Sequence, residues 1–434
     1  CALALASAVR NEYQDPQCGD RQVMVQLFEW KWSDIALECE LFLGPRGYCA
    51  VQVSPPNEHV VVDNPPRPWW QRYQPVSYVI ESRSGNQWEF QDMVDRCRHV
   101  GVRVIVDVVL NNMASTGRQG EGNRRYPMRN CPQFGMTDLD QSREHVQDAM
   151  AEFLGGLLRM GVSGFRVNGA KFMWPQDLRA IQEKVNERSG GIKPFYLLDV
   201  YDTGSDDVTA REYADLGYVT EYRYAQRVAE GVRDFTKAFV FVDTPAYSTV
   251  RALDLTFKHP REYIMATAFT LAYGYGSAQV MSSFEFDDYN QGPPSNAGYS
   301  TRDGYCQGGW VCEHRWRDIF KLVPFSNAVA GKDVNHVTAN QDVVAFSRGR
   351  NGFFAMISGA NFSGELDTGL PPDDYCEELS NCDIILTVDE NGKMQVDMRD
   401  DYNPFIAILT GCNEILLAAT TALSHLPSQR RDAG

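Results

Sequence analysis

The chain has 434 residues, of which 43% are hydrophobic, so it can bury the core of one large domain and of a smaller one. Its formal net charge of -16 argues against nucleic acid and anionic membrane surfaces as partners, because either polyanion would repel it. Neutral glycans and protein partners remain open as ligands, and we expect a monomer.

Residues 1–8 are typical of the end of a signal peptide, because an apolar run closes on an Ala-Ser-Ala cleavage pattern. The alternative is a frayed apolar tail. Eleven cysteines are consistent with export and disulfide formation. The sequence has no run of about 18 apolar residues, so we expect no membrane span. We therefore predict a secreted, extracellular protein.

From residue 23 onward, β-rich runs alternate with amphipathic helical patterns, as in parallel β/α units. The first helix should be capped by Ser33 or Asp34 and stop at Gly44, and a later helix should begin at Pro175. The expected strands cover residues 23–28, 50–54, 102–110, 195–199, 218–221, 239–243 and 277–281, with one more strand leading into Asn168. Helices are expected at residues 33–43, 88–100 and 142–160. Eight such units predict an α/β fold, a closed (β/α)8 barrel with its reactive groups at the C-terminal ends of the strands.

Beyond about residue 330, short alternating runs separated by Gly, Asn and Asp turns predict a small antiparallel β domain. Its expected strands include residues 343–347, 352–356 and 405–409. The domain boundaries follow from these changes of pattern. They are a barrel over residues 9–113 and 138–329, a polar excursion over 114–137, a β domain over 330–412 and a tail over 413–434.

Several motifs run along the chain, namely Leu-Phe-Glu-Trp-Lys-Trp at 27–32, Pro-Trp-Trp-Gln-Arg-Tyr at 68–73, Gly-Phe-Arg-Val-Asn at 164–168 and Trp-Val-Cys-Glu-His-Arg-Trp at 310–316. Together with residues 52–58 and 280–283, they resemble the motifs of animal-type α-amylases of glycoside hydrolase family 13. The resemblance spans roughly residues 20–412. It implies a TIM barrel (domain A), a calcium-bearing excursion after strand 3 (domain B) and a C-terminal β-sandwich (domain C). The excursion at 114–137 is much shorter than the family's domain B.

The resemblance also implies three disulfides, which pair Cys39 with Cys97, Cys306 with Cys312, and Cys376 with Cys382. Cys131 matches a family half-cystine whose partner has no counterpart here. No pairing is assigned to Cys18, Cys49 or Cys412, since connectivity does not follow from sequence alone.

The family's three catalytic positions are all substituted. The nucleophilic aspartate is Asn168, the acid glutamate is Asp199, and the transition-state-stabilising aspartate is Ala246. Retaining glycosidases need one carboxylate as nucleophile and one carboxylic acid as proton donor, and an amide cannot form the glycosyl ester. The shorter Asp199 also misplaces its carboxyl group. The resemblance therefore predicts a homologue that has lost hydrolysis, a pseudoenzyme.

Other carboxylates could in principle replace the lost pair, because Asp107, Asp202 and Asp243 lie near strand ends beside Asp199. The favoured interpretation is that Asp107 and Asp243 are scaffold residues. Deamidation of the Asn168-Gly169 pair would produce an aspartate at position 168, but the loss at Ala246 would remain.

Six residues occupy substrate-binding positions of the family, one of which, Asn112, replaces a histidine. They are Trp69, Trp70, Tyr73, Gln74, Asn112 and Lys171. Adjacent tryptophans in a Pro-rich loop could stack on the C-H faces of sugar rings and hold a glycan without any chemistry. The alternative is that the rings only pack against the rim of the barrel.

A calcium site is also implied by the resemblance. Asn111 and Asp138 match its side-chain ligands, and Arg129 and Phe172 occupy positions that contribute backbone carbonyls. Oxygen ligands of this kind suit calcium.

The family's chloride site, by contrast, is predicted to be lost, because Thr244 and Gln279 replace two of its ligands and leave Arg166 as the one cation. Arg166 could instead be the structural partner of a strand-end carboxylate such as Asp107. Asn361-Phe362-Ser363 forms a glycosylation sequon.

Three functions compete on these grounds. The first is a secreted, inactive amylase homologue that binds an α-glucan, another glycan or a protein partner. The second is an α-amylase with residual or altered endo-α-1,4-glucan hydrolysis that uses Asp199. The third is a structural, storage or immune-facing protein that uses the fold alone.

Overall fold

The structure is a computed structural model that describes residues 18–115, 129, 135–190, 193–224, 238–243, 255–294, 306–357, 361–400 and 404–411. The predictions for residues 1–8, Cys131, Thr244, Ala246 and the tail from Cys412 lie outside these ranges. The chain divides into two compact units. One runs to Val323 and the other begins at Pro324, with residues 271–273 belonging to the second.

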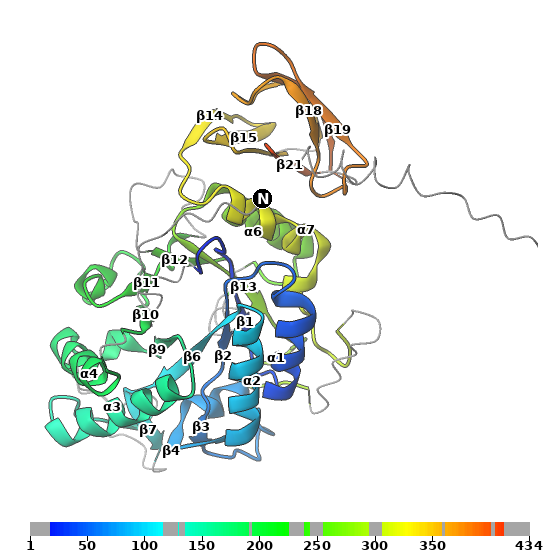
Figure 1. Ribbon diagram of the computed structural model, residues 1–434. Helices are drawn as coiled ribbons and strands as arrows, with labels where there is room; N and C mark the ends of the chain where they lie inside the picture. The colour runs from blue at the N-terminus through cyan, green and yellow to red at the C-terminus, as the bar shows by residue number, and fades with distance from the viewer. Residues whose placement is uncertain are drawn as a thin grey trace, which may run out of the picture. The chain divides into compact units, whose positions relative to one another are not determined.

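In the described part of the first unit, eight parallel strands close into a barrel (Figure 1). The strands follow one another around the barrel in sequence order, and the last pairs with the first, Met24 lying opposite Gln279. They are β1 (Met24–Leu27), β2 (Ala50–Val53), β6 (Arg103–Val109), β9 (Gly164–Asn168), β10 (Phe195–Leu198), β11 (Tyr218–Thr220), β12 (Ala238–Phe241) and β13 (Ser277–Ser282). No strand end differs by more than two residues from its expected position, and the predicted (β/α)8 fold is confirmed.

The barrel strands form in mainly apolar runs, because a parallel strand in a barrel is buried on both faces. The polar exceptions include Gln52, Asp107 and Arg166, which bond one another. Every residue of β1, β2 and β10 is buried, as is every residue of β6 after Arg103. Met24, Ala50, Ile105, Leu197 and Phe241 belong to one cluster in the core.

Helices alternate with the strands of the barrel. They are α1 (Trp32–Glu38), α2 (Gln87–His99), α3 (Glu144–Arg159), α4 (Pro175–Arg188), α6 (Pro260–Tyr273), α7 (Arg317–Phe320) and α8 (Leu322–Ala328). In α2, Asn86 and Glu89 form a reciprocal capping box. Helix α4 begins at Pro175 as predicted, after a left-handed Gly169 with φ 62° and a short turn at Ala170–Phe172.

The prediction that Ser33 or Asp34 caps the first helix is wrong. The N-cap is Lys31, whose side chain makes no capping hydrogen bond. The N–H of Trp32 instead donates to the carbonyl of Ser84 at 3.0 Å. Trp32 is 1% exposed and packs edge-on against Phe90, so tertiary packing places the helix start one residue earlier than the local signal does. The helix continues as a π-helical turn over Cys39–Leu43 and stops at Gly44, as predicted.

The excursion after β6 starts and ends in a short hairpin. Strand β7 (Asn112–Ser115) pairs antiparallel with β8 (Met136–Asp138), and Asn112 lies opposite Asp138. A separate small sheet joins β3 (Asn57–His59), β4 (Pro75–Ser82) and β5 (Gly85–Asn86). The two hairpin strands therefore bring the expected calcium ligands of the excursion to its base.

The described part of the second unit holds two four-stranded antiparallel sheets, which confirms the predicted C-terminal β domain. One sheet has the order β14-β15-β16-β21 and the other β17-β20-β19-β18. The strands are β14 (Val334–Ala339), β15 (Val343–Arg348), β16 (Gly352–Ile357), β17 (Asn361–Asp367), β18 (Asp373–Cys376), β19 (Ile385–Val388), β20 (Lys393–Arg399) and β21 (Phe405–Leu409). In β20, buried and exposed residues alternate, as expected for a strand with one face on a core.

Four disulfides join cysteines of the described residues. Three are the predicted pairs, Cys39 with Cys97, Cys306 with Cys312, and Cys376 with Cys382. The fourth joins Cys18 to Cys49, neither of which had been assigned a partner. Over the same residues, no helix combines the length and the apolar character that crossing a membrane would require.

Candidate functional site

The C-terminal ends of three neighbouring barrel strands bring the polar residues of the candidate site together. Asp107 lies on β6 and is paired in register with Arg166 on β9, whose last residue is Asn168. Asp199 directly follows β10, and its N–H donates to the carbonyl of Val167 at 3.1 Å. The barrel register therefore fixes the nucleophile and acid positions beside each other.

Arg166 is the centre of this group. One of its Nη atoms donates to Asp107 Oδ1 at 3.1 Å and to Asn168 Oδ1 at 3.4 Å, and the other donates to Asp199 Oδ2 at 2.7 Å. Burial opposes its charge, but the attraction of Asp107 and Asp199 outweighs this and raises the pKa of the guanidinium above its ordinary value. The predicted structural pairing of Arg166 with Asp107 is present.

Asp107 is fully buried, and its carboxylate is surrounded by donors. Besides Arg166, it accepts from Tyr73 Oη at 2.9 Å and from Gln52 Nε2 at 3.2 Å. Burial raises the pKa of Asp107, and Arg166 and Tyr73 oppose that rise. Burial and the neighbouring Asp107 together raise the pKa of the Tyr73 hydroxyl, so this hydroxyl acts as a donor. These contacts fit the scaffold role that the sequence favours for Asp107.

Both carboxylate oxygens of Asp199 are engaged by donors. Arg166 holds Oδ2, the Tyr222 hydroxyl donates to Oδ1 at 2.5 Å, and the N–H of Gly169 approaches Oδ2 at 3.5 Å. Tyr222 was not among the predicted site residues. It stands two residues beyond the end of β11, so the rule that reactive groups follow barrel strands could have identified it.

The polar network continues around the barrel on the other side of Asp107. Gln279 on β13 donates to Gln52 at 2.7 Å, and Gln52 donates to Asp107. Gln279, predicted to replace a chloride-binding arginine of the family, uses its amide in a side-chain hydrogen bond. Hydrogen bonds thus run from β13 through β2, β6 and β9 to Asp199 and Tyr222.

The two tryptophans of the expected aromatic lip lie on a 3₁₀ turn over Trp69–Tyr73. Trp69 packs edge-on against Phe28, Tyr73 and Tyr289, with ring centroids 5.7–5.9 Å apart, and its indole N–H donates to the Tyr289 carbonyl. The indole N–H of Trp70 donates to Asn290 Oδ1 at 3.0 Å. Both rings are half-buried, and the Trp69 ring is partly covered by the aromatic rings packed against it.

The remaining substrate-binding positions make contacts within the chain. Asn112 Nδ2 donates to the Tyr73 carbonyl at 3.3 Å, and Gln74 Oε1 accepts from the Ser115 N–H at 3.4 Å. Lys171 is buried and donates to Asp206 at 2.8 Å and to the Tyr201 carbonyl at 2.5 Å. The hydrogen bond from Lys171 holds the pKa of Asp206 below its ordinary value.

The two expected side-chain ligands of calcium lie on adjacent strand ends. The carbonyl of Asn111 accepts from the Leu139 N–H at 2.9 Å, which places Asp138 next to Asn111. Asn111 is 3% exposed, and within the described residues its Oδ1 has no hydrogen-bond partner. Burial and the charge of Asp140 raise the pKa of Asp138 to about 6. A buried amide oxygen without a donor beside a half-buried carboxylate is an arrangement that a hard cation would satisfy.

The positions expected to supply backbone carbonyls are linked through Tyr213. Its hydroxyl lies 2.8 Å from the carbonyl of Met173 and 3.2 Å from that of Lys171, on either side of Phe172. Arg129 Nε donates to the same hydroxyl at 3.1 Å, and its guanidinium lies over the Trp174 ring. Across the described ranges, no group of three His, Cys, Asp or Glu side chains could hold a metal ion, so any metal here would depend on amide and carbonyl oxygens.

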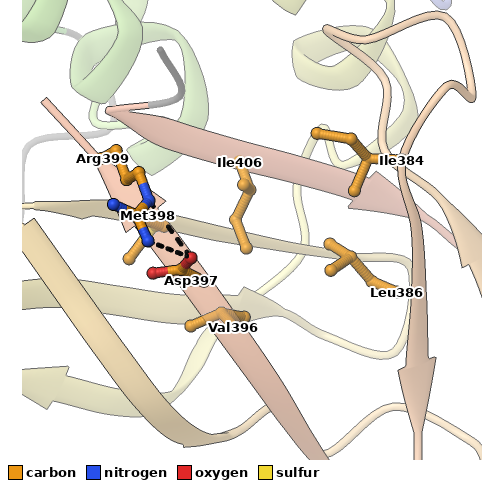
Figure 2. A pocket seen from close by; sticks show the side chains of 7 residues that line it. All are labelled: Ile384, Leu386, Val396, Asp397, Met398, Arg399 and Ile406. Atoms are coloured by element: carbon orange, nitrogen blue, oxygen red, sulfur yellow. Dashed lines mark hydrogen bonds and ion pairs between the residues drawn. The ribbon is translucent and has the colours of Figure 1, made fainter. Parts of the chain in front are cut away.

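Two hollows lie outside this network, one in each unit. In the first unit, a cavity of about 530 Å³ has Asp63, Arg67, Arg83 and Asn290 in its wall. Figure 2 shows the hollow of the second unit, about 350 Å³, with an apolar lining that includes Leu386, Met398 and Ile406. Its polar members are the ion-paired Asp397 and Arg399. The first cavity adjoins the aromatic turn, because Asn290 accepts from Trp70.

An eight-stranded parallel barrel with carboxylates at its strand ends, an excursion after the third strand and an all-β second unit define an α-amylase-type protein. Comparisons with known proteins agree. Residues 334–409 match the family model "Alpha amylase, C-terminal all-beta domain". An alpha-amylase-related protein from Drosophila pseudoobscura pseudoobscura is 38% identical, in an alignment of 482 positions that covers 94% of this chain and 97% of that protein. The chain belongs to the α-amylase family.

Solved structures give the same result. Alpha-amylase I from Eisenia fetida is 34% identical, with a TM-score of 0.83 over 92% of this chain and 99% of that one. A mutant of the same amylase, solved with maltohexaose, has a TM-score of 0.82 at the same identity and coverage. The animal α-amylase resemblance predicted from the motifs is therefore confirmed.

Proposed function

We propose that this chain is a secreted α-amylase-family protein that does not hydrolyse glucans by the family's mechanism. The observation that carries the proposal is Asn168 at the end of β9, where its amide oxygen accepts from Arg166. A glycosyl-enzyme ester needs a carboxylate at the attacking position, and a neutral amide cannot supply one. Secretion is supported by the four disulfides of the described residues, since disulfides persist in oxidising compartments.

The contacts of Asp199 support the same proposal. A general acid must present a proton to the leaving oxygen of the substrate. Here Arg166 and Tyr222 donate to the two oxygens of Asp199, so both oxygens act as hydrogen-bond acceptors. It is also one methylene shorter than the glutamate of the family, and small displacements of a catalytic group reduce rates strongly.

A hydrolysis assay on a chromogenic maltooligosaccharide at high protein concentration tests the proposal. We expect no turnover by the wild type or by Asn168→Ala. The triple variant Asn168→Asp, Asp199→Glu and Ala246→Asp should regain measurable hydrolysis if only the chemistry has been lost. Cleavage by both the wild type and Asn168→Ala would overturn the proposal in favour of residual hydrolysis with another nucleophile.

We further propose that the rim retains α-glucan binding at Trp70. The ring is half-buried, its N–H is fixed by Asn290, and Asn290 also lines the adjacent cavity. A structural relative has been solved with maltohexaose. Calorimetry with maltoheptaose should show binding that Trp70→Ala weakens and that Trp88→Ala, a highly exposed tryptophan on α2, leaves unchanged. Absence of heat from the wild type would instead favour a protein partner or a purely structural role.

We also propose that Asn111, Asp138 and the carbonyls of Arg129 and Phe172 hold calcium. The buried amide oxygen of Asn111 and the neighbouring carboxylate of Asp138 are the observations that support it. Bound calcium would supply structural cross-linking at the base of the excursion. Calcium should raise the melting temperature of the wild type and not that of Asp138→Ala. An equal rise in both would contradict the assignment.

A further inference from the structure

The Asn168-Gly169 pair at the end of β9 is placed among charged groups that contact its reactive atoms. In an Asn-Gly pair, the backbone nitrogen of glycine can attack the side-chain carbonyl carbon of asparagine and close a five-membered succinimide. Gly169 has a left-handed conformation with φ 62°, and no Cβ hinders the approach. Its N–H points at Asp199 Oδ2 at 3.5 Å, outside the strand ladder that ends at Asn168.

The other half of the reacting pair is contacted by a cation. Arg166 Nη1 donates to Asn168 Oδ1 at 3.4 Å, so the guanidinium polarises the carbonyl that the nitrogen would attack. A fixed donor of this kind stabilises negative charge that develops on an oxygen. The same guanidinium forms an ion pair with Asp199 at 2.7 Å, which presents Asp199 as a carboxylate to the Gly169 N–H.

We propose that this cluster makes Asn168 a self-deamidation site, with Asp199 as the base and Arg166 as the oxyanion donor. The Gly169 nitrogen bonds to Asn168 Cγ while its proton passes to Asp199. The Cγ–Nδ2 bond then breaks, and the side-chain nitrogen leaves as ammonia after taking that proton. Water hydrolyses the succinimide to aspartate or isoaspartate, so the net reaction consumes one water and releases one ammonia.

This inference goes beyond the proposed function, because it concerns a covalent change that is detected without any substrate. Its product carries a carboxylate at the position of the family's nucleophile. Ala246 stays unchanged, so the modified chain would still lack one of the three catalytic carboxylates.

The sequence contains two further Asn-Gly pairs, which serve as internal controls. Gly352, of the pair Asn351-Gly352, lies inside β16 and is paired in register with Arg348 and Leu409. The Gly392 N–H, of the pair Asn391-Gly392, donates to the Asp389 carbonyl at 3.0 Å. The Asp389 carboxylate accepts from the Asn391 side chain at 3.3 Å, but the Gly392 N–H does not donate to that carboxylate. Within the described ranges, no arginine or lysine donates to the side chain of Asn351 or Asn391.

Peptide mapping of the aged protein tests the proposal. The folded chain is incubated at neutral pH in heavy-oxygen water, digested with trypsin at mildly acidic pH, and the Asn, Asp and isoAsp forms of each peptide are quantified by mass spectrometry. Deamidation at Asn168 should be at least about tenfold faster than at Asn351 in the folded chain. The difference should vanish after reduction and unfolding in guanidinium. Equal folded-state rates at the two sites would overturn the proposal.

A matched pair of variants separates the base from general flexibility. Asp199→Asn should slow deamidation of folded Asn168 by about 100-fold, the range typical of a general base. Asp148→Asn makes the same replacement at a residue of α3 that pairs with Lys184 and Arg188, and it should change the rate by less than about threefold. An unchanged rate in Asp199→Asn would refute the role of Asp199. If that variant does not fold, the comparison of folded and unfolded wild type still decides.

Discussion

Replacing Arg166 by methionine should destabilise the barrel more than any comparable surface change. The substitution keeps an unbranched side chain but removes the only cation bonded to Asp107 and Asp199 among the described residues. The side chain of Asp107 is 0% exposed and that of Asp199 is 14% exposed, so both charges would lose their partner in a buried environment. Breaking a buried ion pair from one side costs about 3–5 kcal/mol, because it leaves uncompensated charge.

The expected loss is measurable by calorimetry of the intact chain. At about 2 °C per kcal/mol for a domain this large, Arg166→Met should lower the melting temperature by roughly 6–10 °C. The matched control is the double variant Asp107→Asn with Arg166→Met. It replaces the fully buried charge with an amide, so most of the loss should be recovered. A double variant no more stable than Arg166→Met would show that packing, and not charge, causes the effect.

The pH dependence follows from the direction of the pKa shift at Asp107. Burial already raises its folded-state pKa above 3.8, and removing Arg166 raises it further. Because its folded-state pKa is raised, the contribution of Asp107 to stability is fully present below its pKa in the unfolded chain. That contribution is lost as the pH rises through its pKa in the folded chain. The difference in the free energy of unfolding between the wild type and Arg166→Met should therefore be largest near neutral pH and smallest near about pH 4. A gap that is the same at both pH values would refute the electrostatic reasoning.

Three further predictions concern the scaffold. Replacing Cys18 and Cys49 by serine should cost about 2–4 kcal/mol in urea denaturation, and more than replacing Cys376 and Cys382, because the first pair closes 31 residues and the second only 6. Glu38→Gln should cost about 3–5 kcal/mol by the same measurement, since buried Glu38 pairs with Arg315 at 2.5 Å; a loss near zero would contradict this. Burial lowers the pKa of His59 to about 4, so its NMR signals should show the neutral ring down to about pH 5, and a midpoint near 6.5 would be inconsistent with the structure. The depressed pKa means that the contribution of His59 to stability is present above 6.5 and is lost as the pH falls toward 4.

The barrel was predictable because its strands are buried on both faces, so each appears in the sequence as a short run of mainly apolar residues. The run at residues 102–110 and the strand β6 over Arg103–Val109 illustrate this agreement. The start of α1 was not predictable, because the N–H of Trp32 is satisfied by Ser84, about fifty residues further along the chain. Similarly, Cys18 and Cys49 come together only once the chain has folded.

In the candidate site, too, some residues could be predicted from the sequence and others could not. The strand-end rule and the family motifs located Asp107, Arg166, Asn168 and Asp199, which the structure brings together. The strand-end rule also applies to Tyr222, two residues beyond β11, but neither the rule nor the motifs indicated that its hydroxyl bonds Asp199. Side-chain partners across a barrel depend on register and stagger, which apolar periodicity does not encode.

The hydrogen-bond network at the strand ends compensates the charges that the barrel retains there. A working glycosidase must leave at least one carboxyl group poised to transfer a proton and another poised to attack, at some expense of stability. Here donors from Arg166, Tyr73 and Tyr222 bond the oxygens of both remaining carboxylates, and Asn168 adds a neutral acceptor in place of a third charge. A single guanidinium then balances two carboxylates instead of three. Under the proposed function, an amide at position 168 would both remove the attacking carboxylate and relieve like-charge repulsion beside Asp107 and Asp199.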